Sequence, residues 1–317
     1  MYYPFFRGKQ FELLLLKEIA EKIAEWNFVP IIEPVKSNFS ALLRALEALI
    51  EHDCHFILIC NPQVGELEKD NSALWSDVFK NELLSEYTNF AVGLNLTASD
   101  RLATAENFFN DHSVPTAIIH WGFSEGKVLS ELIRVETPNI TEHIFVEHKN
   151  STTLYRKHFT GTKRVIVKDG FNVQKNIDYP PAEPFSELYL IYEDLSCDGF
   201  GDFLIVGSDY QEGGGPAYAI AIHLTYIDSA ADNAIAIKHY VSDRGDTPKD
   251  PAGKYLEALE KLDRDVRERN SLILQTDAVK EYLHFFHAQH FPGLGYTKKL
   301  SMQHHLELMA HLLTKEA

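Results

Sequence analysis

Polar side chains recur at the ends of short apolar segments of this chain, where they could act together. Glu33 interrupts the segment PIIEPV, and Glu147 directly follows Phe145 and Val146. A carboxylate with apolar neighbours needs a partner, because burying an unpaired charge is costly. We therefore expect both carboxylates to belong to a site, in which either could serve as a general base.

Other segments end in amide, imidazole and ammonium groups, which extend this candidate site. Lys168 would act as an electrostatic clamp, and the whole ring could hold a divalent cation or polarise a phosphate or carbonyl group. The sequence does not identify a cofactor. An alternative is that polar residues stand here only because loops begin where strands end. The expected catalytic residues are Glu33, His120, Glu147 and Lys168, and the expected ligand-binding residues are Lys36, Asn61, Asn95, Asp169, Asp209 and Arg244.

Histidines gather near the C-terminus of the chain. His284, His287 and His290 are three residues apart, and His304 adjoins His305. Three-residue spacing places side chains on one side of a helix, so zinc binding is conceivable. The chain has no HExxH motif, however, and adjacent histidines cannot both face one point on a helix. We interpret this cluster as a polar helix face or an interface.

The elements that must position these residues follow a repeated pattern. Apolar segments alternate with amphipathic helical ones, at intervals of about 25–35 residues that are typical of βαβ units. Continuous apolar strands are typical of a parallel sheet that is covered on both faces. The sequence predicts strands at residues 28–35, 55–61, 90–96, 116–121, 142–148, 163–169 and 203–207, and helices at residues 8–25, 40–51, 73–85, 99–110, 127–133, 151–159 and 186–195.

The last third of the chain breaks this rhythm. Residues 218–226 and 234–241 predict an antiparallel hairpin, and helical segments follow from residue 254. This order favours an α/β fold, a modified TIM-like (β/α)8 barrel with a late hairpin and a C-terminal helical appendage. A doubly wound open sheet is the alternative, but no strand precedes a GxGxxG or GxxxxGKS/T motif.

The expected barrel sets both the domain division and the place of the site. We expect residues 1–245 to form the barrel domain, including the hairpin at 218–241, and residues 246–317 to pack on it as helices. In such a barrel the C-terminal ends of the strands meet at one mouth, where side chains point toward one axis. The candidate residues would converge there.

The charge of the chain limits its partners. Its 317 residues include 46 acidic and 30 basic side chains, which gives a formal net charge of −16. The composition is that of a globular protein. Direct binding to nucleic acid or to an anionic membrane is disfavoured, because phosphates would be repelled over most of the surface.

The cysteines and the apolar segments indicate a compartment. Cys54, Cys60 and Cys197 form no CxxC pair, which suits free thiols in a reducing environment. The N-terminus lacks the order of a signal peptide, and no apolar stretch approaches the ~18 residues that span a bilayer. We expect a cytoplasmic protein.

Six short stretches of the chain carry a family resemblance: YYPFFRGK at residues 2–9, PIIEPVK at 30–36, GDFLIVG at 201–207, AIHLTY at 221–226, FPGLG at 291–295 and HHLE at 304–307. Together they resemble the beta-protein family of phages and bacteria. The resemblance implies a barrel-like fold and, in bacteria, a partner that is often encoded nearby and is similar to PD-(D/E)xK nucleases. It also implies a role in phage defence or mobile elements, and it transfers no catalytic residues.

These observations leave three functional hypotheses. The first is a component of an anti-phage or mobile-element system, which acts with a partner protein and binds a small anionic or nucleotide-like ligand at the mouth. The second is a metal-assisted hydrolase of phosphate esters that uses the same residues. The third is a non-catalytic scaffold barrel, with the histidine-rich C-terminal region as its interface.

Overall fold

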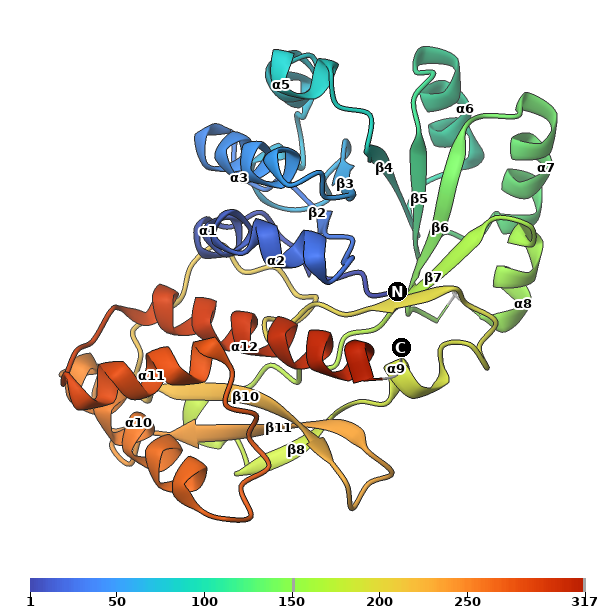
Figure 1. The fold of residues 1–317 in the computed structure, drawn as a ribbon. Coiled ribbons are helices and arrows are strands. Elements are labelled where there is room, and N and C mark those ends of the chain that lie inside the picture. The colour runs from blue at the N-terminus through green and yellow to red at the C-terminus, as the bar shows by residue number, and fades with distance from the viewer. Residues whose placement is uncertain (150–151, 316–317) are drawn as a thin grey trace. The chain divides into compact units, whose positions relative to one another are not determined.

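The computed structural model describes residues 1–149 and 152–315, which form two compact units. The first unit contains residues 1–169 and 188–203, and the second contains residues 170–187 and the chain from residue 204 onward. Figure 1 labels the elements of both. The chain therefore divides at different places from the single boundary that we expected at residue 245.

The first unit is a nearly closed barrel of eight parallel strands, in the order β1-β2-β3-β4-β5-β6-β7-β9. Backbone N–H groups of Tyr3 and Phe5 donate to the carbonyl oxygens of Phe200 and Asp202, which returns the last strand to the first. This arrangement confirms the predicted modified (β/α)8 barrel. The strands are β1 (Phe5–Phe6), β2 (Ile31–Ile32), β3 (Phe56–Ile59), β4 (Phe90–Thr97), β5 (Thr116–Trp121), β6 (Ile140–Val146), β7 (Lys163–Val167) and β9 (Gly199–Gly201).

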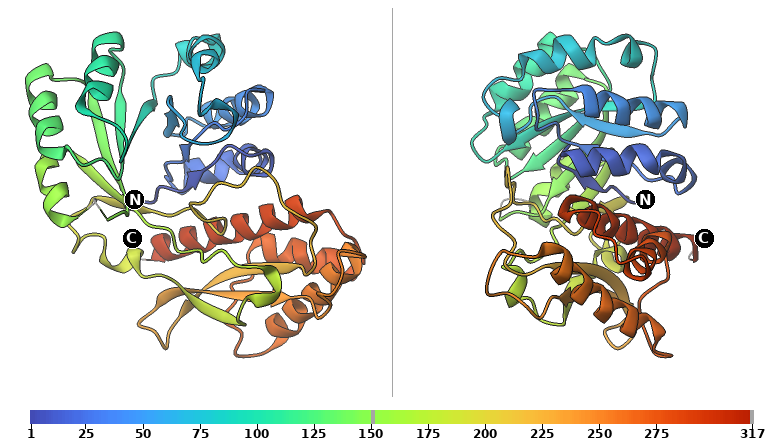
Figure 2. Two further views of the ribbon diagram at one scale, coloured as in Figure 1. Left: turned by 180° about the vertical axis from the view of Figure 1, so that it is seen from behind. Right: turned by 90° about the vertical axis from the view of Figure 1, so that its left-hand side faces the viewer.

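Helices alternate with these strands, and α6, α7 and α8 lie outside β4–β7 (Figure 1; seen from behind in Figure 2). Leu94 and Ile118 on the outer face of the sheet pack with Phe108 of α6 and Leu129 of α7. The strands are thus apolar on both faces, as their sequences predict. The helices are α1 (Gln10–Glu18), α2 (Ala20–Glu25), α3 (Ser40–Glu51), α4 (Ser72–Leu74), α5 (Glu82–Ser85), α6 (Leu102–Asp111), α7 (Gly126–Glu136), α8 (Thr153–Arg156) and α9 (Leu188–Ile191).

The interior of the barrel is filled by alternate residues of the strands. Successive side chains of a strand point to opposite faces, so residues two apart share the inner face. Ile57, Ile59, Ile119, Val146 and Val167 belong to this interior cluster. This alternation decides which of the polar candidates face the barrel axis.

Two strand predictions are wrong, and both errors have a local cause. Residues 203–207 do not form a strand, because the chain turns at Leu204, which has a φ of 53°. The eighth barrel strand is β9, immediately before that turn. Strand β1 was missed because only two residues of the aromatic N-terminal stretch are extended, and the predicted helix that follows begins at Gln10.

The second unit is built on a three-stranded antiparallel sheet in the order β10-β11-β8. The sequence predicts the hairpin but not β8. Ile222 and Leu224 of β10 pack in one core with Tyr255, Leu259 and residues of the following helices, which explains why the hairpin groups with them. The elements are β8 (Ala182–Ser186), β10 (Ala221–Asp228), β11 (Ala234–Val241), α10 (Pro251–Arg267), α11 (Asp277–His287) and α12 (Leu294–Lys315).

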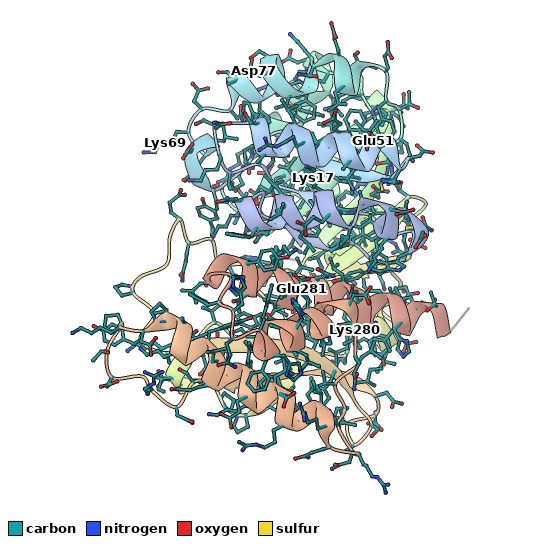
Figure 3. The ribbon with its side chains drawn as sticks, turned by 60° about the vertical axis from the view of Figure 1, so that its left-hand side comes forward. Lys17, Glu51, Lys69, Asp77, Lys280 and Glu281 are labelled. Carbon is teal, nitrogen blue, oxygen red and sulfur yellow. The ribbon has the colours of Figure 1, made fainter. Side chains whose placement is uncertain are left out.

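The outward faces of the helices are polar. Lys17 on α1, Glu51 at the end of α3 and Lys280 on α11 are exposed charged residues of this kind (Figure 3). Within the described ranges, no helix combines the length and the apolar character that crossing a membrane requires.

Candidate functional site

A polar network joins the C-terminal ends of the first four barrel strands. Arg7 follows β1 and forms a buried ion pair with Glu33, which follows β2. The second carboxylate oxygen of Glu33 accepts a hydrogen bond from the backbone N–H of Gln63 at 2.8 Å. Glu33 is fully buried, so the expectation that it needs a partner is confirmed.

The backbone is shaped to permit this pair. Gly8 has a φ of 61°, and a Cβ atom at this position would lie 2.8 Å from the carbonyl oxygen of Glu33. A side chain there would therefore both strain the backbone and clash with the second strand. Glu12 accepts a hydrogen bond from the backbone N–H of Arg7 at 2.5 Å, which fixes the start of the loop.

The network continues through two amides. The Gln63 side chain donates to the carbonyl oxygen of Asn61 at 2.8 Å. The Asn61 side chain donates to the carbonyl oxygen of Asn95 at 2.7 Å and accepts from its backbone N–H at 2.8 Å. Asn61 thus extends the pairing between β3 and β4 by one side chain, and it holds the backbone of Asn95 in place.

Asn95 is where this network ends. Its side chain is fully buried, and neither its Nδ2 nor its Oδ1 atom has a hydrogen-bond partner in the described residues. Ala91 lies in the interior cluster, and a Cβ atom at Gly93 would contact Ile57, Ile59 and Ile119 of that cluster. Asn95 is two residues further along β4, so its amide faces the barrel axis.

Aromatic rings form one wall of the mouth. The rings of Phe5, Trp121 and Phe203 pack together, with centroid separations of 4.7–5.7 Å. The Arg7 guanidinium lies over all three, 5.0 Å from the Trp121 ring centroid. Cation–π contact together with the ion pair therefore holds the Arg7 charge inside the barrel.

Glu147 and Lys168 meet each other rather than Glu33. Each directly follows an inward-facing valine, Val146 or Val167, at the end of its strand. Their side chains are 53% and 38% exposed and lie 3.5 Å apart. They form an ion pair at the rim, and Glu147 is not the buried carboxylate that its apolar neighbours suggested.

His120 lies on the outer face of β5, because Ile119 and Trp121 on either side of it face inward. Its ring is hydrogen-bonded to Tyr155 at 2.8 Å and to His143 at 2.9 Å, and it stacks on Phe145. Burial lowers the pKa of His120 well below its usual value. His120 is therefore a neutral residue of the layer between strands and helices, and it does not reach the mouth.

The other expected ligand-binding residues lie at several different places in the chain. Lys36 pairs with Glu66 at 3.0 Å in an exposed contact. Asp169 is partly buried and ends the first segment of the first unit. Asp209 is exposed and belongs, like Arg244, to the second unit. The guanidinium of Arg244 is already engaged by Glu257 and Asp250, next to the start of α10.

Of the late histidines, His304 and His305 are buried in the second unit, whereas His284, His287 and His290 on and after α11 are exposed. His304 is hydrogen-bonded to the Thr276 hydroxyl and to the Thr225 carbonyl oxygen, both at 2.8 Å. The adjacent His305 contacts the Thr225 hydroxyl at 3.0 Å. In the ranges 1–149 and 152–315, no group of three or more His, Cys, Asp and Glu residues is arranged to hold a metal ion.

Glu33, Asn61 and Asn95, which the sequence predicts as candidates, lie in this network, whereas Arg7 and Trp121 were not predicted. Arg7 stands directly after an aromatic pair, and Trp121 ends a predicted strand. Both residues could have been predicted from the sequence, because a large or charged residue at the end of an apolar strand is expected to lie at the mouth of the barrel. A comparison with protein-family models gave no match to this chain, and a comparison with curated proteins gave none either.

Proposed function

We propose that this protein binds a small anionic or nucleotide-like ligand at the mouth of its barrel. The observation that supports this most strongly is the buried amide of Asn95, which has no hydrogen-bond partner in the described residues. Leaving a buried amide unsatisfied costs about 1–3 kcal/mol. A ligand that satisfied the amide would recover this free energy on binding.

The geometry favours binding over hydrolysis. The two carboxylate oxygens of Glu33 accept hydrogen bonds from Arg7 and from the backbone of Gln63. To act as a general base or to ligate a metal ion, Glu33 would have to leave a buried ion pair. Glu147 is paired with Lys168 at the rim, apart from this network.

We further propose that the protein is cytoplasmic and acts with a nuclease-like partner in a bacterial anti-phage or mobile-element system. The support for this context is the resemblance of residues 2–9, 30–36 and 291–295 to the beta-protein family. Ligand binding at the mouth would then be the event that the partner senses.

Untargeted mass spectrometry of small molecules released from the purified protein tests the binding proposal. We expect one compound to be released from the wild type and from N110A, a control at an exposed asparagine on α6, but not from N95L. Release of nothing, or equal release from all three proteins, would contradict it.

The defence role is tested separately. Cells that carry the protein with its neighbouring gene are challenged with phage, and plaques are counted for the wild type, N95L and N110A. We expect N95L alone to lose protection. Equal plaque counts with and without the wild-type protein would remove the proposed context and leave the binding proposal standing.

A further inference from the structure

The chemistry of the Asn95 side chain restricts what the ligand can present to it. A carboxamide offers N–H donors and a carbonyl acceptor side by side, and it carries no charge. Both groups of Asn95 are buried and have no partner in the described residues. The complementary group must therefore supply an acceptor next to a donor, which a phosphate oxygen alone does not do.

Hydrogen bonds to the backbone of Asn95 hold this residue in one position, so its side-chain amide is presented to a ligand from a fixed point. Its backbone N–H and carbonyl groups are both held by the Asn61 side chain. Asn61 is in turn tied to Gln63, whose backbone binds Glu33. Fixing a recognition group through a second layer of hydrogen bonds reduces the entropy lost on binding.

The next strand carries an aromatic residue on the same inner face as Asn95. Asn95 pairs in register with Ile119, and Trp121 is two residues further on the same inner face. Trp121 is partly buried, so some of its indole surface is not covered. Arg7, Phe5 and Phe203 cover part of this indole, and its exposed remainder suits contact with a flat heteroaromatic group that pairs with the amide along its edge.

The positive charge at the mouth is already matched. Arg7 pairs with Glu33 inside the barrel, and Lys168 pairs with Glu147 at the rim. Charge attraction is therefore a weaker source of specificity here than the neutral amide.

From these contacts we infer that the ligand presents a nucleobase edge to Asn95, with adenine as the best match. An asparagine amide can pair with adenine through two hydrogen bonds, since the 6-amino group donates and a ring nitrogen accepts. This inference rests on the proposed ligand-binding function and names the part of the ligand that the barrel reads.

Calorimetric titration of the full chain with three probes tests this inference. The probes are adenosine 5′-monophosphate, the matching purine riboside monophosphate that lacks the 6-amino group, and ribose 5-phosphate. We expect the adenine nucleotide to bind about tenfold or more tighter than either analogue, because one good bidentate pair is worth about 1–3 kcal/mol.

Two variants separate recognition from folding. N95L removes both polar groups, and N95D keeps the size of the side chain but loses the donor. Each should weaken binding of the adenine nucleotide by about tenfold to a hundredfold and leave ribose 5-phosphate unchanged, while N110A behaves as wild type. Circular dichroism of each variant confirms that it is folded.

The outcomes distinguish this inference from the proposed function. If ribose 5-phosphate binds as tightly as the nucleotide, and N95L does not alter it, the mouth binds an anion and the nucleobase inference is overturned. If no probe binds, and a high-resolution structure shows only a buried water at Asn95, the inference and the ligand-binding proposal both fail.

Discussion

At the scale of single residues, the sequence predicts which polar side chains need a buried partner better than it predicts which face of a strand they occupy. Glu33 was correctly expected to be buried with a partner, because its neighbours in the sequence are apolar. His120 and Asn95 both lie late in strong strands, yet one faces the helices and the other faces the barrel axis. A shift of one residue along a strand reverses the face, and the sequence does not reveal the register closely enough to choose.

Arg7→Met tests the buried ion pair. The substitution leaves the Glu33 carboxylate buried with one partner fewer, so we expect the free energy of unfolding to fall by about 3–5 kcal/mol in urea denaturation. The matched control is Arg264→Met, which breaks an exposed pair with Glu260 and should cost less than ~1 kcal/mol. Similar small losses in both variants would show that the mouth pair contributes little to stability.

At the scale of elements, long periodic segments were predicted well and short ones were not. The bounds of β5 and β11 agree with the prediction, and three helices follow residue 250 as expected. Strand β1 has two residues, and β8 contains Pro184. Such segments become strands only because neighbouring strands supply their hydrogen bonds, and this information is not local.

Asp265 joins helix α10 to strand β11 of the hairpin through hydrogen bonds, so its removal should weaken the contact between these two elements. This residue of α10 accepts hydrogen bonds from Lys238 at 2.7 Å and Tyr240 at 2.6 Å, both on β11, and from Ser271 at 2.9 Å. We expect Asp265→Ala to lower the free energy of unfolding by about 2–3 kcal/mol, as the loss of charged hydrogen bonds does.

Two further variants serve as controls for the loss of stability expected in Asp265→Ala. Tyr240→Phe removes one of the three bonds and should cost about 1 kcal/mol, whereas Glu260→Ala on the exposed side of the same helix should change stability by no more than about 0.5 kcal/mol. A loss at Asp265 no larger than the loss at Glu260 would refute the connecting role.

At the scale of the whole molecule, the sequence predicted the barrel but not the division of the chain. The barrel follows from its repeated apolar strands, which are a local signal. The division depends on which core covers the hairpin, and that core includes residues from three later helices. An expected boundary at residue 245 followed the linear order of elements, whereas the units interleave along the chain.

Buried histidines should make the whole molecule less stable in mild acid. Burial lowers the pKa of His143 and of His223 to about 3, and of His304 to about 4. Unfolding returns these rings to a pKa near 6.5, so the unfolded chain binds more protons between that pH and the folded values. Stability should therefore fall as the pH drops from about 6.5 toward 4.

Urea denaturation at about pH 7.5 and about pH 5 measures this slope. His304→Gln should reduce it, because one ring that takes up a proton on unfolding is gone. His287→Gln, at an exposed position, should leave the slope unchanged. A wild-type stability that is equal at the two pH values, or that is higher in acid, would contradict the assignment of neutral buried histidines.

The interleaved units have a consequence for the order of events during synthesis. The last barrel strand ends at Gly201, so every strand of the barrel is synthesised before the hairpin. Strand β8 emerges earlier still, at Ala182–Ser186, but its partner β11 begins only at Ala234. For that interval β8 has no partner strand, and an unpaired edge is open to wrong partners. A longer interval between the synthesis of β8 and that of β11 would prolong the time in which β8 has no partner strand.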